Sequence, residues 1–506
     1  MNYKEALEAL RRLDREYRHL THVLALLQWD QETYLPKDGV EDRSEQLAML
    51  GGMAHGHLID PGVGKYLREA GVTEENPAGD ERLSGEDRDF LRVFSREYYK
   101  AVKLPPDFVR YAAKTEGLSQ AAWAEARQKS DFSFFMPHLS AVVEIAKKRA
   151  QYWGYGDRAY DGLLDIYEPG MTEGDVRAIF DPLKIRLKEL AERVTAKGPR
   201  PSVFSGFAYD SGAQHQFSLK LMEYLGFDTK RGRLDTSAHP FTTTLGACDV
   251  RITTRYLAEN PLSGIFSTIH ETGHAFYELG MSGSHRGTCL GDGCSMGIHE
   301  SQSRLWENVI GRGTAFWTGL FPLLRSYFPD QLGSISLDAF IREANRVALS
   351  PIRIEADELT YSLHIIVRFD LERRLFSGGL SVEQLPHAWN TLMKELLNVE
   401  VKNDKEGVLQ DVHWSMGSFG YFPSYALGNL YGLQLWKKLC ADIPQVDDHI
   451  AQGKFDTIRE WLNQAVYRWG RRLRPEELLT RATGQGLKAD SFMEYLEKKY
   501  TKIYEL

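Results

Sequence analysis

The sequence is poor in cysteine, with only Cys248, Cys289, Cys294 and Cys440 among 506 residues. Four cysteines are too few for a disulfide scaffold in a chain of this length, so we expect reduced thiols and a cytoplasmic protein. Runs of about 18 apolar residues, the length that a membrane-spanning helix needs, are absent, and we expect no membrane partner. The N-terminal residues MNYKEALEALRRLDREYRHL are charged and have a helical pattern from the first turn, so we do not expect a signal peptide.

Basic residues are also fewer than acidic residues. The chain has 62 lysines and arginines against 70 aspartates and glutamates, which gives a formal net charge of −8 at pH 7. It has no basic run with interleaved aromatic residues, so nucleic acid is not an expected partner. Linkers rich in proline, serine or glycine, low-complexity tracts and internal repeats are absent as well. We therefore expect a single domain over residues 1–506, with two lobes around a groove as an alternative arrangement.

Helical periodicity dominates what is present. Apolar residues recur at spacings of three and four, most clearly in 3–30, 175–194 and 455–473. The main exception is 239–256, HPFTTTLGACDVRITTRY, which is rich in threonine and β-branched residues and alternates at 249–253. We predict a short strand or hairpin there. It is either a buried structural ribbon or an edge strand that pairs with an extended peptide.

The segment FSTIHETGHAFYELG, residues 266–280, contains an HExxH motif. His270 and His274 stand four residues apart, which places both imidazoles on one face of a helix, where they can bind one metal ion. Zinc accepts imidazole nitrogen and carboxylate oxygen, and Glu271 can take a proton from a water at the open position. The alternative is a chance HExxH on a solvated helix face. The apolar neighbours of the motif instead indicate a buried helix, whose histidines need partners.

A catalytic zinc site needs a third protein ligand. The best candidate is Glu300, which stands 26 residues after His274 and opens an amphipathic helix in SMGIHESQSRLWENVIGRG. Its alternative role is a surface ion pair with Arg304, four residues further along that helix. His299, on an adjacent helix face, is a competing ligand. From the spacing alone these alternatives stay open.

The HExxH segment and the segment around Glu300 belong to a longer set of motifs that resembles a known family. Four long motifs and several short ones, in this order along the chain, are similar to the carboxypeptidase Taq family of metallocarboxypeptidases, peptidase family M32. The long motifs are HETGHAFYE at 270–278, HRGTCLGDGCSMGIHESQSRLWEN at 285–308, IRIEADELTYSLHIIVRFDLE at 352–372 and QDVHWSMGSFGYFPSYALG at 410–428. The short motifs are LLQWDQETYLP at 26–36, YDGLLDIYEPGMT at 160–172, HPF at 239–241 and DVRIT at 249–253. Leu35 stands where the family usually has methionine, and Cys289 where we expect proline.

The resemblance implies a mostly α-helical fold with a small β-sheet and a deep central groove, of the gluzincin-like kind, in one catalytic domain over 1–506 that usually forms a homodimer. It implies His270, His274 and Glu300 as metal ligands and Glu271 as general base. The implied activity is zinc-dependent removal of single residues from peptides with a free C-terminus. Specificity is expected to be broad, with poor cutting at proline, and Co²⁺ can substitute for Zn²⁺.

Hydrolysis also needs donors for the oxyanion. The segment HWSMGSFGYFPSY offers His413, Tyr421 and Tyr425. A histidine followed by tyrosines on a glycine-rich loop resembles the oxyanion-stabilising segment of related helical metallopeptidases. The alternative for each tyrosine is core packing with a bonded hydroxyl, and the sequence does not discriminate between the two tyrosines.

A carboxypeptidase must also bind the free C-terminal carboxylate, and arginine suits this because its planar fork donates two hydrogen bonds. Arg353 in PIRIEADELTY is the first choice, with an ion pair to Asp357 as its alternative role. Arg251 in DVRIT is the second choice, with bracing of the strand as its alternative. Three weaker candidates stand in or beside matching motifs: His239 for substrate binding, His364, and Asp249 as a residue that orients a zinc-binding histidine.

Two other functions share these motifs. A zinc oligopeptidase that cuts internally or releases dipeptides would have the same metal residues but would not depend on a free C-terminal carboxylate. A non-catalytic helical scaffold that binds peptides would keep zinc for structure alone. Glu271 argues against the scaffold, since structural zinc sites are usually closed by four protein ligands and have no need of a base.

Overall fold

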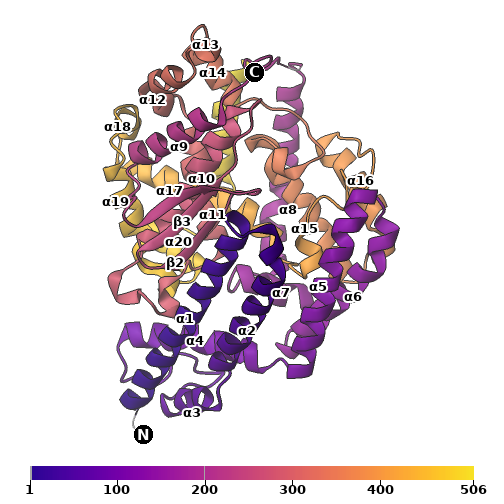
Figure 1. The fold of residues 1–506 in the computed structure, drawn as a ribbon, viewed down its shortest axis with the longest axis vertical. Helices are drawn as coiled ribbons and strands as arrows, with labels where there is room; N and C mark the ends of the chain where they lie inside the picture. The colour runs from indigo at the N-terminus through magenta and orange to yellow at the C-terminus, as the bar shows by residue number, and fades with distance from the viewer. Residues whose placement is uncertain (1–2, 199) are drawn as a thin grey trace.

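Helices make up most of this computed structural model, which describes residues 3–198 and 200–506 (Figure 1). The prediction of a mostly helical fold with a small β-sheet is confirmed. The α-helices are α1 Tyr3–Thr33, α2 Val40–Leu58, α3 Pro61–Glu69, α4 Gly85–Val102, α5 Pro106–Lys129, α6 Phe132–Tyr152, α7 Ala159–Tyr167, α8 Glu173–Thr195, α9 Ser211–Leu225, α10 Pro261–Leu279, α11 Met296–Arg304, α12 Thr314–Tyr327, α13 Pro329–Leu332, α14 Leu337–Ala344, α15 Glu358–Phe376, α16 Leu385–Leu397, α17 Phe422–Asp442, α18 Val446–Ala451, α19 Asp456–Ala465, α20 Pro475–Thr483 and α21 Asp490–Tyr504. The strands are β1 Gly232–Thr236, β2 Thr242–Gly246 and β3 Asp249–Thr254.

Local sequence explains where these helices begin and end. The periodic segment 175–194 lies within α8, whose N-cap Thr172 accepts a hydrogen bond from the backbone of Asp175 while the Asp175 side chain bonds back to the cap. The periodic segment 455–473 is not one helix. It divides into α19 and the 3₁₀-helix η8 (Tyr467–Arg472) at Val466, whose φ of −127° and ψ of −62° are not helical. The chain kinks again inside η8 at Gly470, which adopts a φ of 48° against the backbone of Leu290, where a side chain would clash.

The sheet has the strand order β1-β3-β2. Strands β2 and β3 form the antiparallel hairpin expected within 239–256, and β2 is one of the two edge strands. The sequence did not indicate β1, which pairs parallel to β3 and consists of the short, largely polar segment GRLDT. Helix α10 packs against β2 and β3, and α1 lies against β2. The sheet therefore lies directly beside the helix that carries the HExxH motif (Figure 1).

Two glycines allow three helices to meet closely around that motif. A Cβ atom on Gly273 of α10 would lie 2.8 Å from the carbonyl oxygen of Gln302 in α11. A Cβ atom on Gly428 of α17 would lie 2.7 Å from Cγ of Glu300. Real Cβ atoms do not approach other atoms so closely, so these positions require glycine. Helix α11 continues into a π-helix, η4 (Leu305–Gly311), a form that occurs most often at functional sites.

Apolar side chains gather in one large cluster between Ala122 and Tyr504 and in a smaller one formed by the N-terminal helices. The smaller cluster includes Cys289 and Leu290, which come from the loop between α10 and α11. The backbone N–H of Cys289 donates to Asp14 Oδ2 at 2.7 Å, a bond that proline at this position could not make. The division of 1–506 into one or more domains stays a prediction.

Two expectations from the sequence concerned the state of the cysteines and membrane-spanning helices. All four cysteines are free thiols, with Cys289 and Cys294 buried. Among the described residues, no helix combines the length and the apolar character that a membrane crossing requires.

Candidate metal centre

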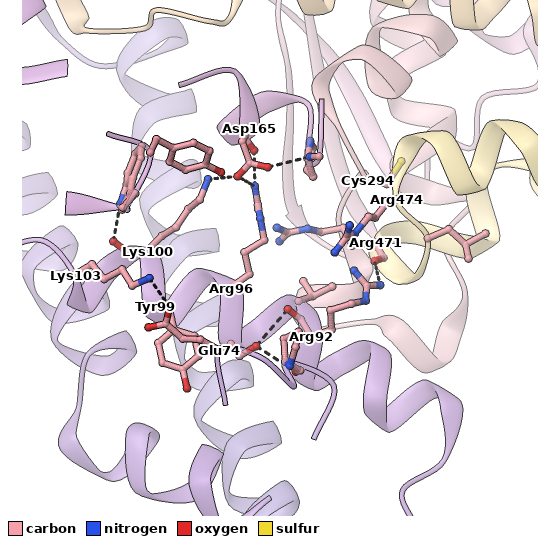
Figure 2. A pocket seen from close by; sticks show the side chains of 18 residues that line it. Glu74, Arg92, Arg96, Tyr99, Lys100, Lys103, Asp165, Cys294, Arg471 and Arg474 are labelled. Atoms are coloured by element: carbon pink, nitrogen blue, oxygen red, sulfur yellow. Dashed lines mark hydrogen bonds and ion pairs between the residues drawn. The ribbon is translucent and has the colours of Figure 1, made fainter. Parts of the chain in front are cut away.

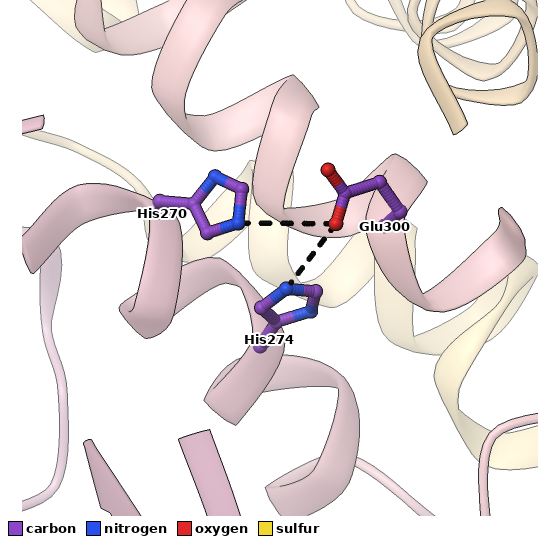
Figure 3. Close-up of side chains that lie close together, drawn as sticks. All are labelled: His270, His274 and Glu300. Carbon is purple, nitrogen blue, oxygen red and sulfur yellow. Dashed lines mark ion pairs between the residues drawn. The ribbon is translucent and has the colours of Figure 1, made fainter. Parts of the chain in front are cut away.

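Helices α10 and α11 bring His270, His274 and Glu300 together (Figure 3). Glu300 Oε2 lies 3.8 Å from His270 Nε2 and 3.5 Å from His274 Nε2, and one ligand atom of each residue lies within 4.8 Å of the others. Zinc binds imidazole nitrogen at about 2.0–2.1 Å in a tetrahedral shell, which separates neighbouring ligand atoms by roughly 3.4 Å. Two imidazole nitrogens and one carboxylate oxygen at these spacings therefore fit a divalent cation.

The outer nitrogen of each histidine is already occupied. His270 Nδ1 lies 2.8 Å from Glu307 Oε2. His274 Nδ1 lies 2.6 Å from His299 Nδ1, and His299 Nε2 lies 2.7 Å from Glu278 Oε1. Donation of the Nδ1 proton to these partners leaves each Nε2 lone pair free for a metal. His299, the competing candidate in the sequence, lies behind His274 as its hydrogen-bond partner.

The two roles considered for Glu300 are compatible. Its Oε1 accepts a hydrogen bond from Arg304 Nε at 2.7 Å, while its Oε2 faces the histidines. Arg304 also reaches Glu307 at 3.4 Å. The ion pair is largely buried rather than on the surface, since the side chains of Glu300 and Arg304 are 8% and 15% exposed. Arg304 therefore orients the carboxylate that faces the histidines.

The protonation states of His274 and Glu300 agree with metal binding, whereas a metal at His270 must displace a proton. Burial lowers the pKa of His274 to about 3, assisted by the charge of His299, so this imidazole is neutral. Burial also opposes ionisation of Glu300 and Glu307, but the charges of Arg304 and His270 outweigh it and hold both carboxyl pKa values well below their usual range. For His270, burial lowers the pKa, and the bond to Glu307 and nearby carboxylates more than reverse this effect.

Glu271 faces the edge strand β2. Its side chain is buried, and Thr242 Oγ1 of β2 donates to Glu271 Oε2 at 2.6 Å. Burial raises the pKa of Glu271, although the charge of His270 and the Thr242 bond act in the opposite direction. Thr242 holds Oε2, and no described residue hydrogen-bonds to the other oxygen of Glu271, which can accept a proton.

His413, Tyr421 and Tyr425 form an aromatic cluster at η7 (His413–Met416) and the start of α17. His413 Nε2 lies 3.3 Å from the Tyr425 hydroxyl, and the rings of Tyr421 and Tyr425 are 5.1 Å apart. Burial, with a contribution from the negative charge of Glu300, raises the pKa of both tyrosines, so their hydroxyls stay protonated donors. Burial lowers the pKa of His413 to about 4. The structure thus brings these three candidates into one cluster, beside the start of the helix whose Gly428 packs against Glu300.

Arg353 is held by residues other than Asp357. Its Nε and Nη2 donate to Asp411 Oδ1 at 3.0 and 2.8 Å, and its Nη1 donates to the Tyr361 hydroxyl at 3.1 Å. Asp357 instead caps α15, where its Oδ1 accepts the backbone N–H groups of two residues. Arg368 donates to Asp411 Oδ2 at 2.7 Å, so one carboxylate serves two guanidinium groups. The cluster therefore has an excess positive charge close to the Tyr425 ring, 5.1 Å from Arg353 Cζ.

The remaining candidates lie on strand β3 (Asp249 and Arg251), just before β2 (His239) and within α15 (His364). Arg251 donates to both oxygens of Asp249, at 3.0 and 2.9 Å, and its guanidinium covers the Trp29 ring at 4.3 Å. Asp249 is thus engaged on the sheet, and the carboxylate that contacts a metal-centre histidine is that of Glu307. His239 is exposed, and its carbonyl accepts from Ser237. His364 is fully buried, and neither ring nitrogen has a partner within the described part of the chain.

Sequence reasoning missed four residues that support the centre, namely Glu307, Thr242, Glu278 and Asp411. Glu307 follows Glu300 by seven residues in the same matching motif, a spacing that repeats one helix face. Asp411 stands in the QDVHW segment that supplied His413. Both were visible as acidic residues in motifs, but only the packing of the helices shows which basic group each one contacts.

The chain is similar to proteins of one known family along almost its whole length. The family model described as carboxypeptidase Taq (M32) metallopeptidase matches residues 9–500. The chain belongs to the M32 family. It is 40% identical to thermostable carboxypeptidase 1 of Thermus thermophilus, with 100% of both chains covered, and 40% identical to carboxypeptidase 1 of Bacillus subtilis, with 99% of both covered. The predicted resemblance is confirmed.

Solved M32 structures share the whole fold. The M32 carboxypeptidase of Deinococcus radiodurans R1 superimposes with a TM-score of 0.95 at 38% identity, covering 99% of this chain and 100% of that one. A Pyrococcus furiosus carboxypeptidase gives a TM-score of 0.94 at 37% identity, covering 98% and 99%. The chain is therefore an M32 metallocarboxypeptidase, which implies a divalent metal and peptide substrates.

Proposed function

We propose that this M32 enzyme is a zinc-dependent carboxypeptidase that releases single residues from free peptide C-termini, with broad side-chain tolerance and poor cutting at proline. The observation that carries the proposal is the convergence of His270 Nε2, His274 Nε2 and Glu300 Oε2 beside the buried Glu271. His270, His274 and Glu300 would hold the metal. Bound zinc supplies Lewis-acid chemistry, polarising the scissile carbonyl and acidifying water, and Co²⁺ is expected to substitute for it.

Glu271 acts as the general base. Its free carboxylate oxygen accepts the proton of the attacking water and delivers it to the leaving amine. The hydrogen bond from Thr242 to the other oxygen supports this role because it fixes the orientation of the carboxylate. The raised pKa of Glu271 also supports it, since a base works best when its pKa is close to the working pH.

Oxyanion stabilisation is assigned to the aromatic cluster. Tyr421 and Tyr425 keep their hydroxyl protons, and a hydroxyl that stays protonated can donate to a developing negative charge. The neighbouring His413 is neutral and orients Tyr425 through the 3.3 Å contact between its Nε2 and the hydroxyl. We propose Tyr425 as the principal donor because it has this support, with Tyr421 in an accessory role.

Recognition of the C-terminal carboxylate is assigned to Arg353. Asp411 and Tyr361 hold its guanidinium in one orientation, and the excess positive charge shared with Arg368 favours an incoming carboxylate. Arg251 is the weaker candidate because Asp249 balances its charge, whereas Asp411 is shared between Arg353 and Arg368. His239 is proposed as a peripheral contact for the peptide, an assignment that its exposure permits.

The test is a pair of peptides with one mixed sequence, one with a free C-terminus and one amidated. Mass spectrometry of each, after incubation with zinc-loaded protein, should show stepwise loss of single residues from the free acid and an intact amide. Cutting of both peptides would contradict carboxylate recognition and favour an oligopeptidase. Failure to cut either, with zinc bound stoichiometrically, would favour a peptide-binding scaffold.

We also propose that the enzyme works as a cytoplasmic homodimer. The free thiols support a reducing compartment, and the family resemblance supports the dimer. Sedimentation equilibrium should give twice the chain mass of 57.7 kDa. A mass that stays at the monomer value across the concentration range would contradict the dimer.

A further inference from the structure

A cavity of about 330 Å³ lies away from the metal centre, between α4, the end of α7 and the segment that joins η8 to α20 (Figure 2). No residue assigned above to the metal, the oxyanion or the C-terminal carboxylate lines it. Its volume is at the lower end of the range found for small-molecule sites. Six of its lining side chains are basic, namely Arg92, Arg96, Lys100, Lys103, Arg471 and Arg474, whereas two are acidic, Glu74 and Asp165.

One face of α4 supplies most of this charge. Arg92, Arg96 and Lys100 stand at successive spacings of four, so their side chains repeat on the same side of the helix. Like charges at this spacing repel and destabilise an isolated helix. The opposite side of α4 carries Phe90 and Phe94, which lie in the smaller apolar cluster. Packing of α4 therefore accounts for its apolar side but not for a row of cations that faces a cavity.

Two carboxylates line the cavity against six cations, and one of the two, Glu74, pairs with Lys103 at 2.9 Å. Asp165 alone serves Arg96 at 2.9 Å and Lys100 at 2.6 Å. Arg92 donates to the backbone carbonyl of Arg472 at 2.7 Å and lies 3.7 Å from its nearest carboxylate. Burial and the charge of Arg96 lower the pKa of Lys100 to about 8, and the shared Asp165 offsets them only in part.

The two basic residues on the opposite side differ in how their charge is balanced. Arg471 is balanced, because it shares Glu97 and Asp292 with Arg18, and Arg18 also pairs with Asp14. Arg474 has no ion pair with any residue in the described ranges 3–198 and 200–506. Figure 2 shows side chains from α4 and from 471–474 pointing into the same space.

We propose that this cavity binds a phosphate-bearing small molecule. A phosphate group has several oxygens that can accept hydrogen bonds at once from arginine and lysine donors on opposite walls. The aromatic rings of Trp153 and Tyr99 line the same cavity and offer an apolar surface to an organic portion of the ligand. The site is independent of the peptidase activity proposed above.

Isothermal titration calorimetry of the metal-loaded protein, at constant ionic strength, tests the proposal with inorganic phosphate, ATP and citrate as probes. Phosphate or ATP should bind, and citrate should bind more weakly. Tighter binding of ATP identifies an organic phosphate as the preferred ligand, whereas equal binding identifies the phosphate group alone. Citrate binding as tightly as either phosphate probe would overturn the phosphate class, and absence of binding by both phosphate probes would overturn the site.

Phosphates also bind metal ions, so variants must locate the binding. Arg474→Gln and Lys100→Gln should each weaken binding roughly tenfold, as expected for loss of a hydrogen bond to a charged group. His270→Ala should leave it unchanged. Arg342→Gln, which removes an exposed arginine on α14, is the matched control. Replacement of Lys100 also removes its ion pair with Asp165, whereas Arg474 has no ion pair within the described residues, so Arg474→Gln decides the test. Binding that survives Arg474→Gln and is lost in His270→Ala would place the probe at the metal centre and overturn the proposal.

Discussion

Glu307 Oε2 lies 2.8 Å from His270 Nδ1, on the far side of the imidazole from Glu300. This contact fixes which ring nitrogen is free for the metal. We predict that Glu307→Gln weakens zinc affinity about 10- to 100-fold, since an amide holds the imidazole proton less well than a carboxylate. Competition with a chromophoric chelator measures the change. Glu278→Gln, one residue further from the metal through His299, should have a smaller effect. An unchanged zinc Kd in Glu307→Gln would contradict the assignment.

Replacement of the proposed base separates catalysis from metal binding. Glu271→Gln should lower kcat by at least about 10²-fold while zinc content stays at one per chain, because the amide cannot accept a proton. Metal analysis and turnover of a free-acid peptide, measured on the same sample, check both parts. Thr242→Val should keep the base but lower kcat by a smaller factor, because it removes the hydrogen bond that orients Glu271. Full activity of the Glu271→Gln enzyme would rule out the base.

Arg353 offers a test of carboxylate recognition. Arg353→Lys keeps the charge but loses the planar fork, and we expect kcat/KM for free-acid peptides to fall about 10- to 100-fold. Any residual cutting of amidated peptides should not change. Arg251→Lys is the matched control, and its effect should be smaller because Asp249 balances the Arg251 charge, whereas Arg353 shares Asp411 with Arg368. If the control shows the larger loss, the two assignments must be exchanged.

The glycine contacts predict a defect in metal binding without a change in any ligand. Gly428→Ala would place a methyl group 2.7 Å from Glu300 Cγ, so α11 and α17 must separate and Glu300 must move. Zinc affinity should fall, with a loss of stability of about 1–3 kcal/mol. Gly117→Ala on α5, where nothing lies within 4 Å of the added Cβ, is the control and should stabilise by about 0.5–1 kcal/mol. Equal zinc affinity in the two variants would contradict the role of Gly428.

Burial raises the pKa of Glu168 from an ordinary 4.5 to about 7, and Gly297 N–H and Ser424 donate to its carboxyl group. The folded protein therefore retains a proton that the unfolded chain loses. The free energy of unfolding should fall as pH rises from about 4.5 to 7, by up to about 3 kcal/mol from this group. Glu168→Gln should remove that part of the decline. Urea unfolding midpoints of both proteins at pH 5 and pH 8 give the comparison, and parallel pH profiles would contradict it.

The residues that the sequence identified are those whose chemistry depends on spacing along one helix. His270 and His274 could be paired from their separation, whereas the spacing left Glu300 and His299 as competing candidates and the family resemblance favoured Glu300. The partners that orient them could not, because Glu307, His299 and Glu278 are defined by how α10 crosses α11. The same limit applies to Arg353, for which the nearby Asp357 was the natural partner in sequence although Asp411, 58 residues away, is the one in the fold.

Secondary structure was also predictable where it depends on a local pattern and not where it depends on long-range contacts. Long periodic segments such as α1 and α8 were predictable, since their patterns repeat over many turns. Strand β1 was not, because five largely polar residues acquire strand structure only by pairing with β3. The kink at Gly470 depends on the approach of Leu290 from a distant loop, which no local pattern contains.

The bond between Cys289 and Asp14 has a consequence for order in the protein. The loop that carries Cys289 is the covalent tether between the two histidines and Glu300, and it is anchored to the first helix, 275 residues earlier in the chain. While the anchor holds, the tether behaves as two short loops, and less chain entropy opposes bringing the third ligand to the first two. Local opening of the N-terminal helices would release it. Amide hydrogen exchange in α1 and in the loop should therefore rise together, and metal affinity should fall with them.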